Sequence, residues 1–134
     1  MWQAIIDENK TVIATNDWDE GTGIPCSPDT PIGWIWNGLD FVEPISSIVK
    51  RYDTALMNHY DAVAQSKNYD NRITCALRAG YVSAFQKEGI AFGTWMDNCN
   101  VIAYSIMNDV ISGKRELPSI ESFIAELPLI KWPS

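Results

Sequence analysis

Residues 32–44 read Ile32-Gly33-Trp34-Ile35-Trp36-Asn37-Gly38-Leu39-Asp40-Phe41-Val42-Glu43-Pro44. Apolar residues alternate on both sides of the Asn-Gly pair, which is typical of a β-hairpin closed by a two-residue turn, because Asn and Gly tolerate positive φ. In that register Trp36 faces Leu39, and Trp34 faces Phe41 across the strands. These four side chains are predicted to share one face of the hairpin with Ile32.

A second hairpin is predicted near the N-terminus. Two short β-prone runs, residues 4–6 and 11–13, flank a polar turn at residues 7–10. Residues 14–31, between the two hairpins, are rich in Asp, Gly, Pro and Thr, which predicts a long surface loop.

After Pro44 the apolar period changes from two residues to about 3.6, which is the period of an α-helix. Ser46 or Ser47 is expected to cap a first helix that ends near Lys67, with Asn68 as its C-terminal cap. The apolar stripe of this helix consists of Ile48, Val49, Tyr52, Leu56, Tyr60 and Val63.

Three further helices are predicted. A short one covers residues 71–79, and a long one covers residues 84–112, where Ser83 and Gln86 have the spacing of a capping box. A last short helix begins after Ser119.

The long helix carries a wide apolar stripe. Its members recur every seven residues or lie in offset rows beside those positions, which favours a bundle or a trimeric helical core. The residues predicted to mediate self-association are Phe85, Phe92, Trp95, Ile102 and Ile106. The alternative is that the stripe is the internal core of one chain. Gly89 and Gly93 each weaken the helix, so a break there is a further alternative.

These patterns predict an α+β protein with a small antiparallel β part at residues 1–44 and an α-helical part at residues 45–134. The net charge also differs between these two parts of the chain. Residues 1–44 hold eight acidic residues and one basic residue, and residues 45–134 hold nine of each. The β part therefore carries the whole net charge of −7.

The composition excludes several classes of protein. With 46% hydrophobic and 20% charged residues the chain is globular, and its acidity disfavours nucleic acid and anionic membranes as partners. No apolar run has the length of a membrane span, and the N-terminus lacks the basic region of a signal peptide. The three cysteines have no metal-ligand spacing, so we expect reduced thiols in a cytosolic protein.

The sequence contains no recognisable catalytic or metal-binding motif. His59 is the single histidine, and no nucleophile or orienting acid can be paired with it. Asp17-Trp18-Asp19-Glu20-Gly21 resembles the start of a calcium loop, but Pro28 stands at the twelfth position, where an EF-hand has a bidentate Glu. We therefore expect no enzymatic activity, no catalytic residue, no metal and no cofactor.

The aromatic face of the hairpin has two interpretations. Trp34, Trp36, Leu39 and Phe41 form the core of the small β part, or they form a patch that binds a partner protein. The two roles are compatible.

Four further stretches accompany the hairpin motif: YDAVAQSKNYDN at residues 60–71, FGTWMD at 92–97, GKRELPSIESF at 113–123 and ELPLIKWP at 126–133. In its order and spacing this set resembles the short tail-associated proteins of tailed bacteriophages. The Trp-Pro ending is similar to the ends of tail fibre assembly proteins.

The resemblance implies a phage tail fibre assembly chaperone. In such a protein the β part would bind the distal part of a tail fibre, and the helical part would support self-association as a trimer that matches a fibre trimer. It would act in the host cytoplasm during phage assembly, and either leave or remain on the virion tail. The alternatives are a permanent structural component of the tail, baseplate or fibre, and a small hydrolase that acts on host surface polymer. For the hydrolase no carboxylate pair stands out.

Overall fold

The computed structural model describes residues 2–17 and 23–134. It confirms the α+β class, with small antiparallel β elements followed by a helical region that contains a long helix. The chain forms two compact units, Met1–Ile48 and Val49–Ser134. The division falls within the first turn of a helix that begins just after Pro44.

The hairpin predicted near the N-terminus is confirmed. Strands β1 (Trp2–Ile6) and β2 (Val12–Asp17) pair in antiparallel orientation. The Asp7 carboxylate holds the turn between them, accepting hydrogen bonds from the backbone N–H groups of Asn9 (2.9 Å) and Thr11 (3.0 Å). Lys10 takes the positive φ that this turn requires.

The predicted loop at residues 14–31 is wrong in part. Strand β2 continues to Asp17, and β3 (Ile24–Pro25) pairs with the other edge of β1, giving a three-stranded sheet in the order β2-β1-β3. The Gln3 side chain contributes by accepting a hydrogen bond from the Gly23 N–H at 3.0 Å. Pro25 is compatible with β3 because β3 is an edge strand, where a missing N–H costs little.

The hairpin around Asn37 and Gly38 forms, but in a different register from the predicted one. Strands β4 (Ile35–Trp36) and β5 (Phe41–Val42) place Trp36 opposite Phe41, not opposite Leu39. The reason is the Asn37 side chain, which accepts hydrogen bonds from the N–H groups of Leu39 (2.9 Å) and Asp40 (2.8 Å). The turn is therefore centred on Gly38 and Leu39, and Gly38 supplies the positive φ of 98°.

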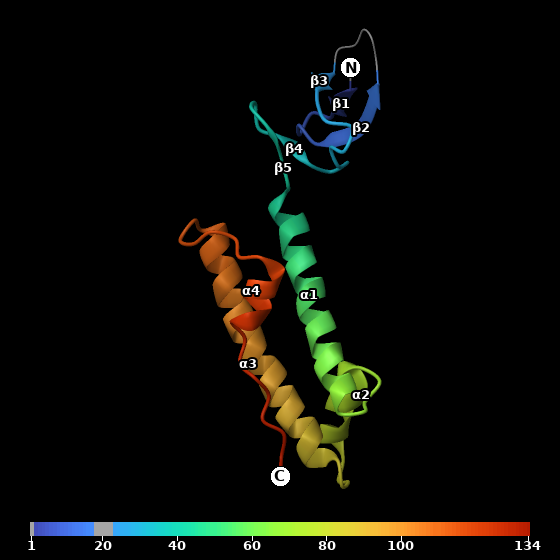
Figure 1. Cartoon of the computed structure of the whole chain (residues 1–134), viewed down its shortest axis with the longest axis vertical. Coiled ribbons are helices and arrows are strands. Elements are labelled where there is room, and N and C mark those ends of the chain that lie inside the picture. The colour runs from blue at the N-terminus through green and yellow to red at the C-terminus, as the bar shows by residue number, and fades with distance from the viewer. Residues whose placement is uncertain (1, 18–22) are drawn as a thin grey trace. The chain divides into compact units, whose positions relative to one another are not determined.

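The four predicted helices are present (Figure 1). They are α1 (Ile45–Ser66), α2 (Arg72–Leu77) with a 3₁₀ turn at Arg78–Gly80, α3 (Gln86–Ile111) and α4 (Ile120–Ala125). Helix α1 begins before the predicted serine caps, and the Ser47 hydroxyl instead donates to the Glu43 carboxylate at 3.0 Å. Asn68 follows the helix with φ 70°, in agreement with its predicted capping role.

Helix α3 is continuous through Gly89 and Gly93, so the expected alternative of a break does not occur. The predicted capping box is wrong. Ser83 accepts a hydrogen bond from the Phe85 N–H at 3.2 Å, whereas the Gln86 side chain donates to the carbonyl of Ala79 at 3.3 Å. The helix start is thus fixed by the preceding 3₁₀ turn.

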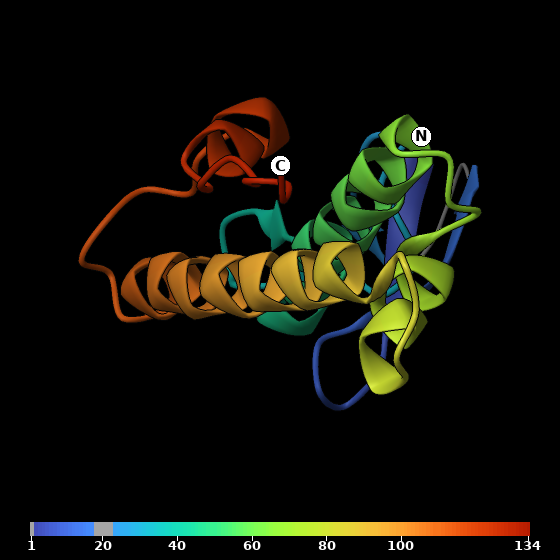
Figure 2. The ribbon, with the colours of Figure 1, turned by 90° about the horizontal axis from the view of Figure 1, so that it is seen from below.

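The core of the helical unit lies between α1, α3, α4 and the C-terminal tail. In Figure 1, α1 and α3 run side by side in opposite directions, and the tail returns along α3; Figure 2 shows the same elements from below. The Tyr60 hydroxyl of α1 donates to the Asn100 side chain of α3 at 2.7 Å. The rings of Tyr52 and Phe123 meet edge to face, with centroids 5.2 Å apart, and join α1 to α4.

Candidate partner-binding site

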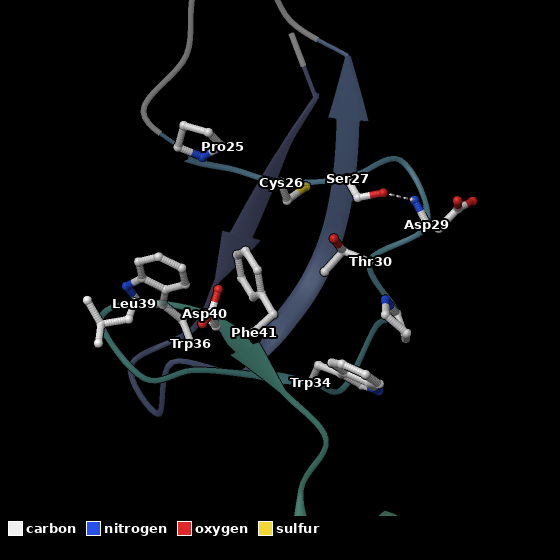
Figure 3. Close-up of a pocket in the computed structure, with 11 residues that line it drawn as sticks. Pro25, Cys26, Ser27, Asp29, Thr30, Trp34, Trp36, Leu39, Asp40 and Phe41 are labelled. Atoms are coloured by element: carbon white, nitrogen blue, oxygen red, sulfur yellow. Dashed lines mark hydrogen bonds between the residues drawn. The ribbon is translucent and has the colours of Figure 1, made fainter.

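The β unit contains an open concavity of about 520 Å³. All four residues that the sequence predicted as partner-binding lie on its wall. Figure 3 shows the lining side chains, which are Pro25, Cys26, Ser27, Asp29, Thr30, Pro31, Trp34, Trp36, Leu39, Asp40 and Phe41.

Trp36 and Phe41 form the aromatic side of this concavity. Their ring centroids are 4.8 Å apart, with the planes tilted by 47°, because the two residues are direct partners across β4 and β5. Both side chains are half-buried. Each therefore supports the β unit and also presents apolar surface to the concavity.

Trp34 and Leu39 occupy other parts of the wall. The backbone of Trp34 is fixed next to β2, since its carbonyl accepts a hydrogen bond from the Val12 N–H at 2.8 Å. Leu39 lies at the tip of the turn and is 84% exposed. It contributes little to the core and is available for contact with a partner. Ile32, which the sequence placed on the same face, is exposed but does not line the concavity.

The segment at residues 25–31 completes the wall; it belongs to the predicted surface loop at residues 14–31, which is the alternative place for partner binding if the aromatic residues are core. A turn shapes the segment, in which the Ser27 hydroxyl accepts a hydrogen bond from the Asp29 N–H at 3.2 Å and the Ser27 carbonyl accepts one from Thr30. The prolines Pro25 and Pro31 were the available signal, because they supply rigid apolar surface within a polar stretch.

The charge on the lining residues has one sign. Asp29 and Asp40 lie on the wall, and none of the described lining residues is a lysine or an arginine. Aromatic rings and carboxylates together favour a partner segment that carries apolar and basic side chains.

The residues predicted for self-association have different environments. Phe92, Trp95 and Ile106 are buried within the helical unit, in agreement with the alternative that the stripe is internal core. Phe85 is 51% exposed, and Ile102 is half-buried. Because three of the five side chains are buried within one chain, their apolar character is explained without a trimer.

His59 lies on α1 at the edge of the helical core. Its ring meets the Trp95 indole edge to face, with centroids 5.6 Å apart, and burial lowers the pKa of the imidazole from 6.5. Within residues 2–17 and 23–134 no group of His, Cys, Asp and Glu side chains could hold a metal ion. Most of the Asp17–Gly21 stretch considered as a calcium loop lies outside the described residues.

None of the helices in the described part of the chain has the length and apolar character needed to cross a membrane. Comparisons of the chain with family models, with curated proteins and with solved structures find no match. The resemblance to phage tail-associated proteins therefore rests on the quoted sequence motifs.

Proposed function

We propose that this protein is a phage tail fibre assembly chaperone, which binds the distal part of a tail fibre through the concavity of its β unit. The observation that carries the proposal is the gathering of Trp34, Trp36, Leu39 and Phe41 on one open, acidic concavity. It acts without catalysis, in the host cytoplasm, while the fibre folds and trimerises.

The physical reason for such a binder lies in the fibre. Intertwined β-rich trimers expose apolar side chains and unpaired strand edges before they assemble, and these surfaces aggregate. A concavity with aromatic walls covers apolar side chains. The net charge of −7 on residues 1–44 attracts a partner segment with basic side chains over a distance of about one Debye length.

Co-expression with the neighbouring fibre gene tests the proposal. We expect the fibre to become soluble and to co-purify with this protein. Equal solubility of the fibre with and without this chain would contradict the proposal. If purified virions contain the protein in stoichiometric amounts, the alternative of a permanent structural component gains support.

A matched pair of variants tests the site itself. Leu39 and Ile32 are both exposed apolar residues of the same segment, but only Leu39 lines the concavity. Leu39→Ala should weaken fibre binding several-fold, and Ile32→Ala should leave it unchanged. Trp36→Ala should have a larger effect, provided that circular dichroism shows an intact β unit. Equal effects of Leu39→Ala and Ile32→Ala would exclude the concavity as the binding site.

A further inference from the structure

Helix α3 carries a second row of residues on the side opposite its buried face. The row has alternating spacings of four and three residues. Its members are all exposed, and they are Ile90, Thr94, Asp97, Val101, Tyr104, Asn108 and Ile111. We call it the outer row.

The outer row is unusually apolar for an exposed helix face. Its four large apolar members are between 50% and 70% exposed, and Val101 and Tyr104 at its centre are 70% and 62% exposed. Alternating spacings of four and three residues are the heptad pattern by which two helices pack together. The row extends over about 32 Å of helix, at about 1.5 Å per residue.

We propose that the outer row is where a second copy of this chain binds, through an antiparallel pairing of the two α3 helices about a twofold axis. In a parallel, in-register pair or trimer Asp97 would lie opposite its own copies, and facing carboxylates repel one another. In an antiparallel pair, the twofold axis crosses α3 at the height between residues 102 and 103, midway between Val101 and Tyr104 of the outer row. This arrangement separates the two Asp97 carboxylates.

The antiparallel arrangement also matches unlike residues across the axis. Val101 faces the partner's Tyr104, and Asn108 faces the partner's Asp97, so an amide N–H can donate to the carboxylate. Thr94 faces the partner's Ile111. Each match occurs twice because the interface is isologous.

Two further features favour a second copy as the occupant. Residues 45–134 contain equal numbers of acidic and basic residues, so two helical units have no net repulsion. A groove lined by Asp97 of the outer row also includes Ile73 and Leu77 of α2, which are 65% and 64% exposed. These two residues add apolar area next to the helix pair.

Cysteine cross-linking determines the orientation of the helices. In a Cys26→Ser background, Thr94→Cys and Ile111→Cys are prepared as separate full-length proteins and oxidised under mild conditions. We expect a disulfide-linked dimer when the two proteins are mixed and exchanged, and monomers on a non-reducing gel when each is oxidised alone. Efficient self-linking of Thr94→Cys, or no link in the mixture, would overturn the proposal.

Light scattering and sedimentation give an independent test. The wild type should be a dimer. Asn108→Asp should weaken it at least tenfold because two carboxylates then face each other, and the added change Asp97→Asn should restore it. Ser105→Asp adds the same charge to an exposed position off the outer row and should have no effect. A monomeric or trimeric wild type, or an Asn108→Asp dimer of unchanged strength, would overturn the proposal. The proposed dimer is independent of fibre binding, because these measurements use this protein alone.

Discussion

The indole N–H of Trp95 donates a hydrogen bond of 2.7 Å to the backbone carbonyl of Pro128. This bond joins the middle of α3 to the point where the C-terminal tail leaves α4. Four residues later Trp132 stacks on Phe92, with ring centroids 6.1 Å apart, and the Lys67 ammonium lies over the Trp132 ring. The tail is therefore part of the core of the helical unit.

Trp95→Phe should destabilise the protein by about 1–3 kcal/mol, because the smaller phenyl ring leaves a gap in the core and the part-buried Pro128 carbonyl loses the indole N–H donor. Urea unfolding followed by far-UV circular dichroism measures this change. Trp132→Phe is the matched control, since its indole N–H has no hydrogen-bond partner among the described residues and its ring contact with Phe92 is preserved. Equal losses in the two variants would show that ring size, and not the hydrogen bond, determines the cost.

Gly89 and Gly93, one helical turn apart on α3, should respond in opposite ways to alanine. A Cβ atom at Gly89 would lie 2.4 Å from the backbone nitrogen of Ala79 and 2.8 Å from the carbonyl carbon of Arg78, so the 3₁₀ turn would have to move away. A Cβ atom at Gly93 has nothing within 4 Å. Gly93→Ala should stabilise the protein by about 0.5–1 kcal/mol through the gain in helix propensity. Gly89→Ala should destabilise it by about 1–3 kcal/mol through overpacking.

Thermal unfolding of the two glycine variants measures both effects. They share the same helix and the same change in helix propensity, so their difference isolates the contact with the 3₁₀ turn. If Gly89→Ala has a melting temperature equal to that of Gly93→Ala, α3 does not approach the turn as closely as described.

The number and course of the helices were well predicted from sequence because their signals are local, although the caps expected at Ser46 or Ser47 and at Ser83 were wrong. The period of 3.6, the left-handed Asn68 and the cap at Ser119 each depend on a few neighbouring residues, and each was found in the structure. The β part was predicted less well because strand pairing depends on distant partners. Strand β3 forms from a polar, proline-containing stretch because it can pair with the free edge of β1. Local residue preferences do not predict which strand edge is available for pairing.

The hairpin shows how a single side chain can override a turn motif. The Asn-Gly pair correctly indicated a turn, but the side-chain oxygen Oδ1 of Asn37 accepts hydrogen bonds from the backbone N–H groups of Leu39 and Asp40, and this moves the centre of the turn by one residue. The facing pairs change, although Trp34, Trp36, Leu39 and Phe41 still gather on one concavity. Similarly, a heptad stripe in the sequence did not distinguish an internal core from a subunit interface, because both are apolar.

Only one of the three cysteines, Cys26, should react with a thiol reagent in the native protein. Burial raises the pKa of both Cys75 and Cys99 to about 11, and both side chains are inaccessible, whereas Cys26 is half-buried beside the concavity. We expect one thiol to react with Ellman's reagent in the native state and three in urea. Cys26→Ser should abolish the native reaction. A native reaction that persists in this variant would show that the helical core opens readily.

Lowering the pH should destabilise the protein through His59, and the sign follows from its pKa. Burial lowers the pKa of the folded-state imidazole below 6.5, so between these two values the unfolded chain binds more protons than the folded chain. The free energy of unfolding should therefore be level above about pH 7.5 and should decrease as the pH falls through 6.5 towards the folded pKa. The bond between Asp61 and the backbone N–H of Arg72 lowers the pKa of that carboxyl, so its own contribution disappears only under more acidic conditions.

Urea unfolding at pH values from 5 to 8 separates the contribution of His59 from that of Asp61. His59→Gln should remove most of the decrease between pH 7.5 and pH 5.5, since glutamine does not titrate. If the variant retains the full decrease, the imidazole is solvated in the folded state and does not pack against Trp95 as described.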